Sequence, residues 1–109
     1  MRFLLESNAC IGYLTGRSPT IATRLASTPP NDIALCSVVK AELLFGARKS
    51  NRVQENVERL STFFAPFVSF AFDDNAADLY GVIRADLEKQ GMPIGPNDLM
   101  IAAIAVRTT

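Results

Sequence analysis

Histidine is absent from the 109 residues of this chain. This absence excludes Ser-His-Asp and Cys-His nucleophilic sites, imidazole acid–base catalysis and most zinc or iron sites. If the chain is an enzyme, we therefore expect carboxylates to carry the chemistry.

Cysteine is scarce as well, since Cys10 and Cys36 are the two that the chain contains. They form no CxxC pair or zinc-like spacing, and both have apolar neighbours, as reduced and buried thiols usually do. We expect two free thiols and no disulfide.

The chain also lacks an excess of charge and a long apolar run. Eleven basic and eleven acidic residues give a formal net charge of zero, with a sequence pI near 6.2. No global field therefore draws the protein to nucleic acid or to anionic lipid, so a polyanion would have to be bound locally. The longest apolar run, residues 99–106, is too short for a bilayer, and the N-terminus does not read as a signal peptide. We expect a cytoplasmic protein with no membrane partner.

What is present is ordinary for one folded domain over residues 1–109, with 49% hydrophobic and 20% charged residues. Short apolar runs alternate with helical patterns along the chain. The expected strands cover residues 3–5, 33–36 and 67–72. The expected helices cover residues 9–14, 20–26, 38–48 and 53–65, a longer one capped by Asp73 and Asp74 and stopped at Gly91, and a last, buried one over 96–106. This alternation predicts a doubly wound α/β domain with a mainly parallel sheet.

The first strand runs directly into a polar trio, Glu6, Ser7 and Asn8. In open α/β sheets ligands bind outside the carboxyl ends of the strands, so the trio is a candidate site. The alternative is a helix cap, in which Ser7 or Asn8 accepts hydrogen bonds from the N–H groups at the start of the next helix.

Two further acids lie on helical faces that we expect to point inward. Glu42 has Val38 and Val39 one turn before it and Phe45 one turn after it, which places it on an apolar stripe of a helix that Ser37 caps. A buried salt bridge is the alternative role for this carboxylate.

Asp98 lies in the first turn of the last helix, with Ile101, Ala102 and Ala105 at helical spacing. It is therefore also expected to point inward. Its alternative role is that of a cap or of a partner for the helix dipole.

A basic cluster, Arg48, Lys49 and Arg52, follows at the end of the Glu42 helix. Such clusters usually complement a helix C-terminus and stay solvated, but this one could also contact RNA phosphates. No aromatic stacking platform is evident from the sequence.

Without histidine or a glycine-rich phosphate loop, three acids at element ends or inward faces indicate a hard-cation site. Mg²⁺ and Mn²⁺ prefer oxygen ligands and need one or two carboxylates plus water. The chemistry that such a site supports best is metal-assisted phosphodiester hydrolysis.

Three segments in this order resemble the acidic motifs of PIN-domain ribonucleases, and most closely those of VapC-type toxins of toxin–antitoxin pairs. They are residues 3–8 (FLLESN), 37–43 (SVVKAEL) and 93–103 (PIGPNDLMIAA). The helix before the third motif, with residues 80–85 and 87–91, fits the same family, so the resemblance covers the whole chain.

The resemblance implies a three-layer α/β/α fold and a Mg²⁺- or Mn²⁺-dependent endoribonuclease, typically a homodimer, that a small antitoxin inhibits. Carried over to this chain, it makes Glu6, Glu42 and Asp98 the metal-binding and catalytic acids. Ser7 and Asn8 would shape the loop around the first acid.

Two features depart from the family pattern. The first acid is ordinarily aspartate, whereas here it is Glu6, which is one methylene longer. The chain ends at Thr109, where family members usually continue with two further strands and a fourth acid, so we expect a PIN-like fold without its C-terminal strands and with residues 2–5 as an open edge. The alternative function is a catalytically degenerate module that binds only an antitoxin or a second copy.

Overall fold

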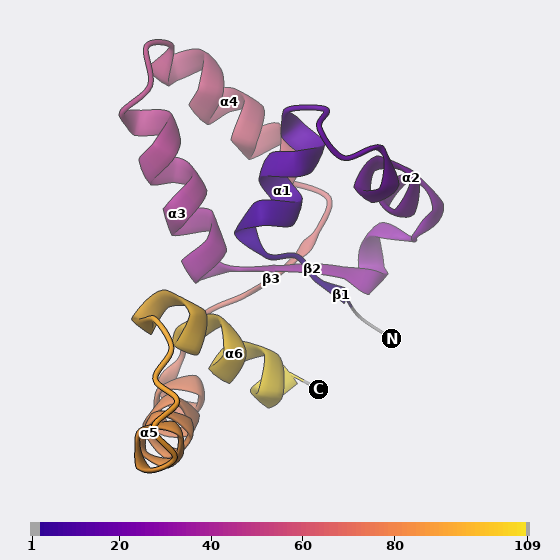
Figure 1. The fold of residues 1–109 in the computed structure, drawn as a ribbon. Helices are drawn as coiled ribbons and strands as arrows, with labels where there is room; N and C mark the ends of the chain where they lie inside the picture. The colour runs from indigo at the N-terminus through magenta and orange to yellow at the C-terminus, as the bar shows by residue number, and fades with distance from the viewer. Residues whose placement is uncertain (1–2, 109) are drawn as a thin grey trace.

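The computed structural model describes residues 3–108, which form a parallel sheet between two helical layers (Figure 1). The strands are β1 (Phe3–Leu4), β2 (Ile33–Cys36) and β3 (Val68–Phe70). Their order in the sheet is β1-β2-β3, and Ala34 of β2 pairs with Leu4 on one side and Val68 on the other. The sheet is therefore parallel, as the alternating pattern predicts.

The helices are α1 (Ser7–Leu14), α2 (Pro19–Ser27), α3 (Ser37–Arg48), α4 (Val53–Phe64), α5 (Asp74–Lys89) and α6 (Pro96–Thr108), with a short 3-10 turn, η1 (Pro30–Asp32), before β2. Figure 1 shows α1 to α4 on one side of the strands and α5 with α6 on the other. This arrangement confirms the three-layer α/β/α prediction. None of the helices within residues 3–108 is long and apolar enough to cross a membrane.

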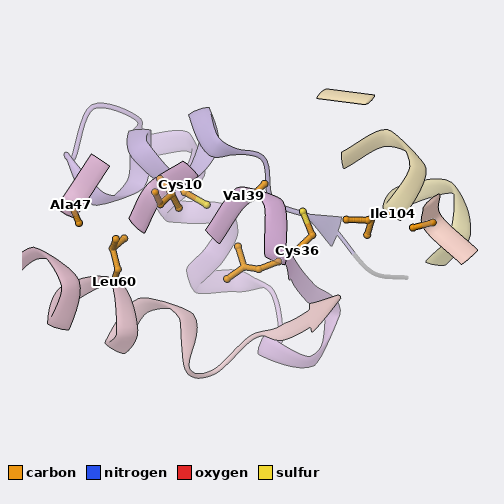
Figure 2. Close-up of a cluster of buried hydrophobic side chains, with 9 residues drawn as sticks. Cys10, Cys36, Val39, Ala47, Leu60 and Ile104 are labelled. Atoms are coloured by element: carbon orange, nitrogen blue, oxygen red, sulfur yellow. The ribbon is translucent and has the colours of Figure 1, made fainter. Parts of the chain in front are cut away.

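The core lies around β2, and Figure 2 shows Cys36 of this strand among the buried side chains. All four residues of β2 are buried. The largest fully buried side chains are Leu35, Ile104, Val39, Cys10 and Cys36. A strand covered on both faces has to be apolar at every position, which explains the unbroken run at 33–36. Both thiols are free, as expected, and burial raises the pKa of Cys10 to about 12.

Several helix starts differ from the sequence prediction. Ser37 does not cap α3: the residue before the helix is Cys36, and the Ser37 hydroxyl instead accepts a hydrogen bond from the Phe72 backbone N–H at 3.1 Å. The third strand is shorter than predicted, and Ser37 ties the segment after it to the start of α3. A serine hydroxyl next to a buried strand thus serves a long-range contact instead of a local one.

The start and end of α5 follow the prediction more closely. Asp73 accepts a hydrogen bond from the Ala76 N–H at 2.9 Å and caps the helix, while Asp74 lies inside its first turn. Gly91 follows the helix with φ of +69°, the left-handed conformation that glycine adopts without strain. Asp73 also pairs with Arg107 of α6 at 3.0 Å, which links the two helices of that layer.

The last helix is less buried than predicted. Leu99, Ala103 and Ile104 lie in the core, but Asp98 and Val106 are exposed. An apolar run on every side of α6 therefore does not mean that every side is covered.

Strand β1 lies at one edge of the described sheet and pairs with β2. This position agrees with the prediction of an edge strand. The expected edge begins at Arg2, which lies outside the described residues.

Candidate active site

The three predicted acids, Glu6, Glu42 and Asp98, line one cleft of about 490 Å³. The complete lining is Glu6, Ser7, Asn8, Glu42, Asp98, Ile101, Ala102 and Ala105. The cleft therefore brings together residues from the N-terminal, middle and C-terminal parts of the chain. All five side chains that the sequence assigned to the site contribute to it.

The parallel sheet explains why the acids converge. Glu6 lies two residues after the end of β1 and directly before α1, and α3, which carries Glu42, begins immediately after β2. The carboxyl ends of neighbouring parallel strands meet at the same edge of a sheet, so the two acids share one side of the molecule. Helix α6 packs against α3 and brings Asp98 to the same place.

Ser7 and Glu42 are linked directly, because the Ser7 hydroxyl donates a hydrogen bond to Glu42 Oε1 at 3.0 Å. Both residues are half-buried. This contact contradicts the helix-cap alternative for Ser7, which lies inside α1 behind Glu6, a residue that caps the helix without a side-chain hydrogen bond. The alternative of a buried salt bridge for Glu42 is also wrong, because no basic side chain among residues 3–108 pairs with that carboxylate.

Asn8 and Asp98 lie at the exposed side of the cleft. Within the described part of the chain, Asp98 accepts no hydrogen bond that would mark it as a cap of α6. Its carboxylate remains available to the cleft, in contrast to Asp73, which is engaged as a cap and as an ion-pair partner.

The chemistry of the lining fits a hard cation. It contains three carboxylates, a hydroxyl and an amide, and no basic side chain. Oxygen donors of this kind are the ligands that Mg²⁺ and Mn²⁺ prefer, and one or two carboxylates completed by water suffice. Among residues 3–108, no three acidic or thiol groups stand close enough together to hold one ion as they are placed. Binding of one cation by all three carboxylates therefore requires these side chains to move closer to one another.

The basic cluster lies apart from the cleft. Arg48 ends α3, roughly 9 Å along the helix axis from Glu42 at 1.5 Å per residue. Arg52 pairs with Glu55 at 3.5 Å, and the Lys49 ammonium lies 5.0 Å from the centre of the Phe45 ring. All three basic residues are exposed and none lines the acidic cleft.

Phe45 is a candidate that the sequence reasoning missed. We expected it on an inward stripe with Glu42, but it is 65% exposed, and the buried stripe of α3 is Val39, Leu43 and Ala47. Phe45 lines a groove of about 530 Å³ to which Glu42 also contributes. The spacing of three residues from Glu42 is the signal that could have placed the ring beside the site.

Comparison with known proteins adds family information to this geometry. The PIN domain family model matches residues 3–109. Ribonuclease VapC2 of Rickettsia felis is 32% identical over 107 residues, covering 97% of this chain and 80% of that protein. The tRNA(fMet)-specific endonuclease VapC of Shigella flexneri is 32% identical over 105 residues, covering 96% and 79%.

Solved structures give the same result at the level of the fold. DNA-bound VapBC from Salmonella typhimurium matches with a TM-score of 0.88 and 31% identity, covering 96% of this chain and 79% of that one. VapBC2 from Rickettsia felis bound to a promoter DNA fragment matches with a TM-score of 0.87 and 32% identity, covering 96% and 80%. The chain thus spans about four fifths of the length of these relatives.

Proposed function

This chain belongs to the PIN-domain family, and we propose that it is a metal-dependent endoribonuclease toxin of a type II toxin–antitoxin system. The observation that carries the proposal is the convergence of Glu6, Glu42 and Asp98 in one cleft without a basic side chain. The relatives named VapC are described as ribonucleases or as a tRNA(fMet)-specific endonuclease, and structural neighbours are VapBC complexes. The reaction is hydrolysis of RNA phosphodiester bonds.

The three acids would hold Mg²⁺ or Mn²⁺, and Ser7 and Asn8 would support them. A bound cation of this kind supplies an activated water and stabilises negative charge on the phosphate. The Ser7 hydroxyl donates a hydrogen bond to Oε1 of Glu42, which leaves Oε2 available to bind the cation. Glu6 and Asp98 are exposed and can move toward Glu42, whereas Glu42 is held on α3 as the fixed member of the set.

The partners follow from the same family. We propose an antitoxin protein as inhibitor, as in the VapBC neighbours, cellular RNA as substrate in the cytoplasm, and a homodimer as the assembled form. The basic cluster of Arg48, Lys49 and Arg52 is the proposed contact for RNA phosphates, since exposed cations at one helix end can bind a polyanion locally.

The experiment is cleavage of a mixed set of structured RNAs with Mn²⁺ or Mg²⁺, with EDTA as the metal-free arm. The test variant is Glu42→Gln, which keeps the shape of the side chain and removes its charge. The matched control is Asp78→Asn, an exposed acid on α5 that does not line the cleft. We expect metal-dependent cutting by the parent and by Asp78→Asn, and its loss in Glu42→Gln. Equal cutting by all three proteins would contradict the assigned site.

A catalytically degenerate binding module is the second candidate function. It is favoured by the spacing of the carboxylates, which as placed do not form a three-ligand cluster within residues 3–108, and by the longer side chain of Glu6. Folded protein that cuts no RNA and still binds an antitoxin would establish this function in place of the nuclease.

A further inference from the structure

Phe45 has the highest exposure among the large hydrophobic side chains of the described chain, at 65%. It lies on α3, one turn after Glu42, while the opposite stripe of the helix, with Val39 and Leu43, fills the core. A phenylalanine in this position keeps most of its ring surface in water. The ring is therefore free to contact a ligand without disturbing the fold.

The ring lines a groove between α3 and α6. The residues of this groove are Ser37, Val38, Ala41, Glu42, Phe45, Asn97 and Met100. Glu42 also lines the acidic cleft, so the groove and the cleft adjoin at this residue. A chain that crosses the cleft can thus extend into the groove without a break.

A cation beside the Phe45 ring suits a nucleotide. The Lys49 ammonium lies over one face of this ring, 5.0 Å from its centre, so a base would stack on the opposite face. An aromatic face with adjacent cations is the arrangement by which proteins hold single-stranded nucleic acid, because the base stacks on the ring and the phosphate meets the cation. A purely apolar partner would gain nothing from the Lys49 ammonium beside the ring.

We propose that Phe45 stacks on an unpaired base of the RNA next to the cleaved phosphodiester, with Lys49 contacting a neighbouring phosphate. This inference rests on the proposed nuclease function and names a residue that selects where it acts. The enzyme then favours segments in which a base can leave its helix, and Phe45 contributes to binding without taking part in the chemical step.

Binding is measured on the full chain carrying Asp98→Asn, so that the RNA is not consumed. The probe is a short single-stranded RNA with 2-aminopurine at successive positions, read by fluorescence quenching and anisotropy. Phe45→Leu should weaken binding about tenfold and abolish quenching, whereas Phe45→Trp should preserve both, because loss of one base stack costs about tenfold or more in affinity. Lys49→Gln should lower the salt dependence of binding by about one phosphate contact.

Val82→Ala is the matched control, since Val82 is an exposed apolar residue on α5, 62% accessible and outside the groove. It should bind as the parent does, and thermal melting checks that every variant is folded. The inference would be overturned if Phe45→Leu bound RNA as tightly as the chain carrying Asp98→Asn alone. It would also be overturned if that chain quenched the 2-aminopurine label at no position. The competing occupant of the groove is a second copy of the chain, and light scattering tests for it. If Phe45→Leu loses a dimer that the parent forms, and this loss accounts for the weaker RNA binding, the groove is a contact between copies.

The two proposals fail differently. If the chain with its native Asp98 cleaves RNA but quenching does not depend on Phe45, the nuclease proposal holds and the stacking proposal is wrong. Phe45-dependent binding without metal-dependent cleavage leaves the stacking contact and removes the nuclease.

Discussion

Ser7 Oγ lies 3.0 Å from Glu42 Oε1, and this hydrogen bond joins the first turn of α1 to the middle of α3 across 35 positions of sequence. It is a bond from a neutral donor to a carboxylate in a half-buried setting, where such bonds are stronger than between neutral groups. Ser7 therefore acts as a positioning residue for Glu42, and its hydrogen bond connects the two helices that follow β1 and β2.

Replacing Ser7 tests this role. Ser7→Ala leaves Glu42 Oε1 without its donor, so the carboxylate samples more rotamers, and we expect about tenfold lower cleavage together with a higher Mn²⁺ concentration for half-maximal activity. Ser7→Thr keeps the hydroxyl and should restore both values. The measurement is the initial cleavage rate against Mn²⁺ concentration.

The control for Ser7 is Ser61→Ala, an exposed serine on α4 that is remote from the cleft lining. A merely structural role of Ser7 would lower the melting temperature without moving the Mn²⁺ dependence. An unchanged Mn²⁺ profile in Ser7→Ala would therefore refute the positioning role, even if the variant were less stable.

Metal binding can be tested without any substrate. A cation that binds only the native state, at about 100 times its Kd, stabilises that state by about 2.7 kcal/mol, which in a domain of this size raises the melting temperature by about 10 °C. We expect this rise with Mn²⁺ or Mg²⁺ in the parent and in Asp78→Asn, and a much smaller one in Glu42→Gln and in Asp98→Asn. Matched ionic strength with NaCl separates specific binding from salt effects.

The same melting series discriminates between the two candidate functions. A rise of equal size in all four proteins means that the cleft is not the metal site. No rise in any of them, with folded parent protein, indicates the degenerate binding module.

The sequence predicts the parallel sheet, and it places Glu6 and Asp98 near element ends, because both features depend on local signals. Ile33–Cys36 is an unbroken apolar run, and a strand buried on both faces requires one. Glu6 and Asp98 stand at element boundaries that glycine, proline and strand ends mark clearly. The convergence of Glu6 and Glu42 then follows from the parallel topology, whereas Asp98 reaches them because α6 packs against α3.

The helical face of α3 is harder to predict. Val38, Val39, Leu43 and Phe45 are apolar on several sides of the helix, so stripes that differ by one residue, or about 100° of rotation, fit the pattern almost equally well. Packing against β2 selects the stripe of Val39 and Leu43 and turns Phe45 outward. The predicted capping roles of Ser7 and Ser37 are wrong for a related reason. Their hydroxyls bond to partners far away in sequence, and local capping rules do not consider such partners.

The buried thiol of Cys10 gives a prediction for alkaline pH. Burial raises its pKa from 9.0 to about 12, so between these values the unfolded chain loses the proton while the folded chain retains it. The stability that the neutral thiol contributes is therefore complete below pH 9 and declines as the pH rises toward 12, at up to about 1.4 kcal/mol per pH unit for this group. Urea unfolding at pH 8.5 and at about pH 10.5 measures the decline.

Cys10→Ala is the reference for this decline, because it removes the thiol and leaves Cys36 and every tyrosine and lysine in place. We expect the parent to lose more unfolding free energy than Cys10→Ala over the same pH interval, by an amount on the order of 1 kcal/mol. The sign is fixed by the direction of the pKa shift: a thiol that ionised more readily in the folded state would make the parent gain stability relative to the variant. Parallel declines in the two proteins would show that the fold does not raise the pKa of Cys10.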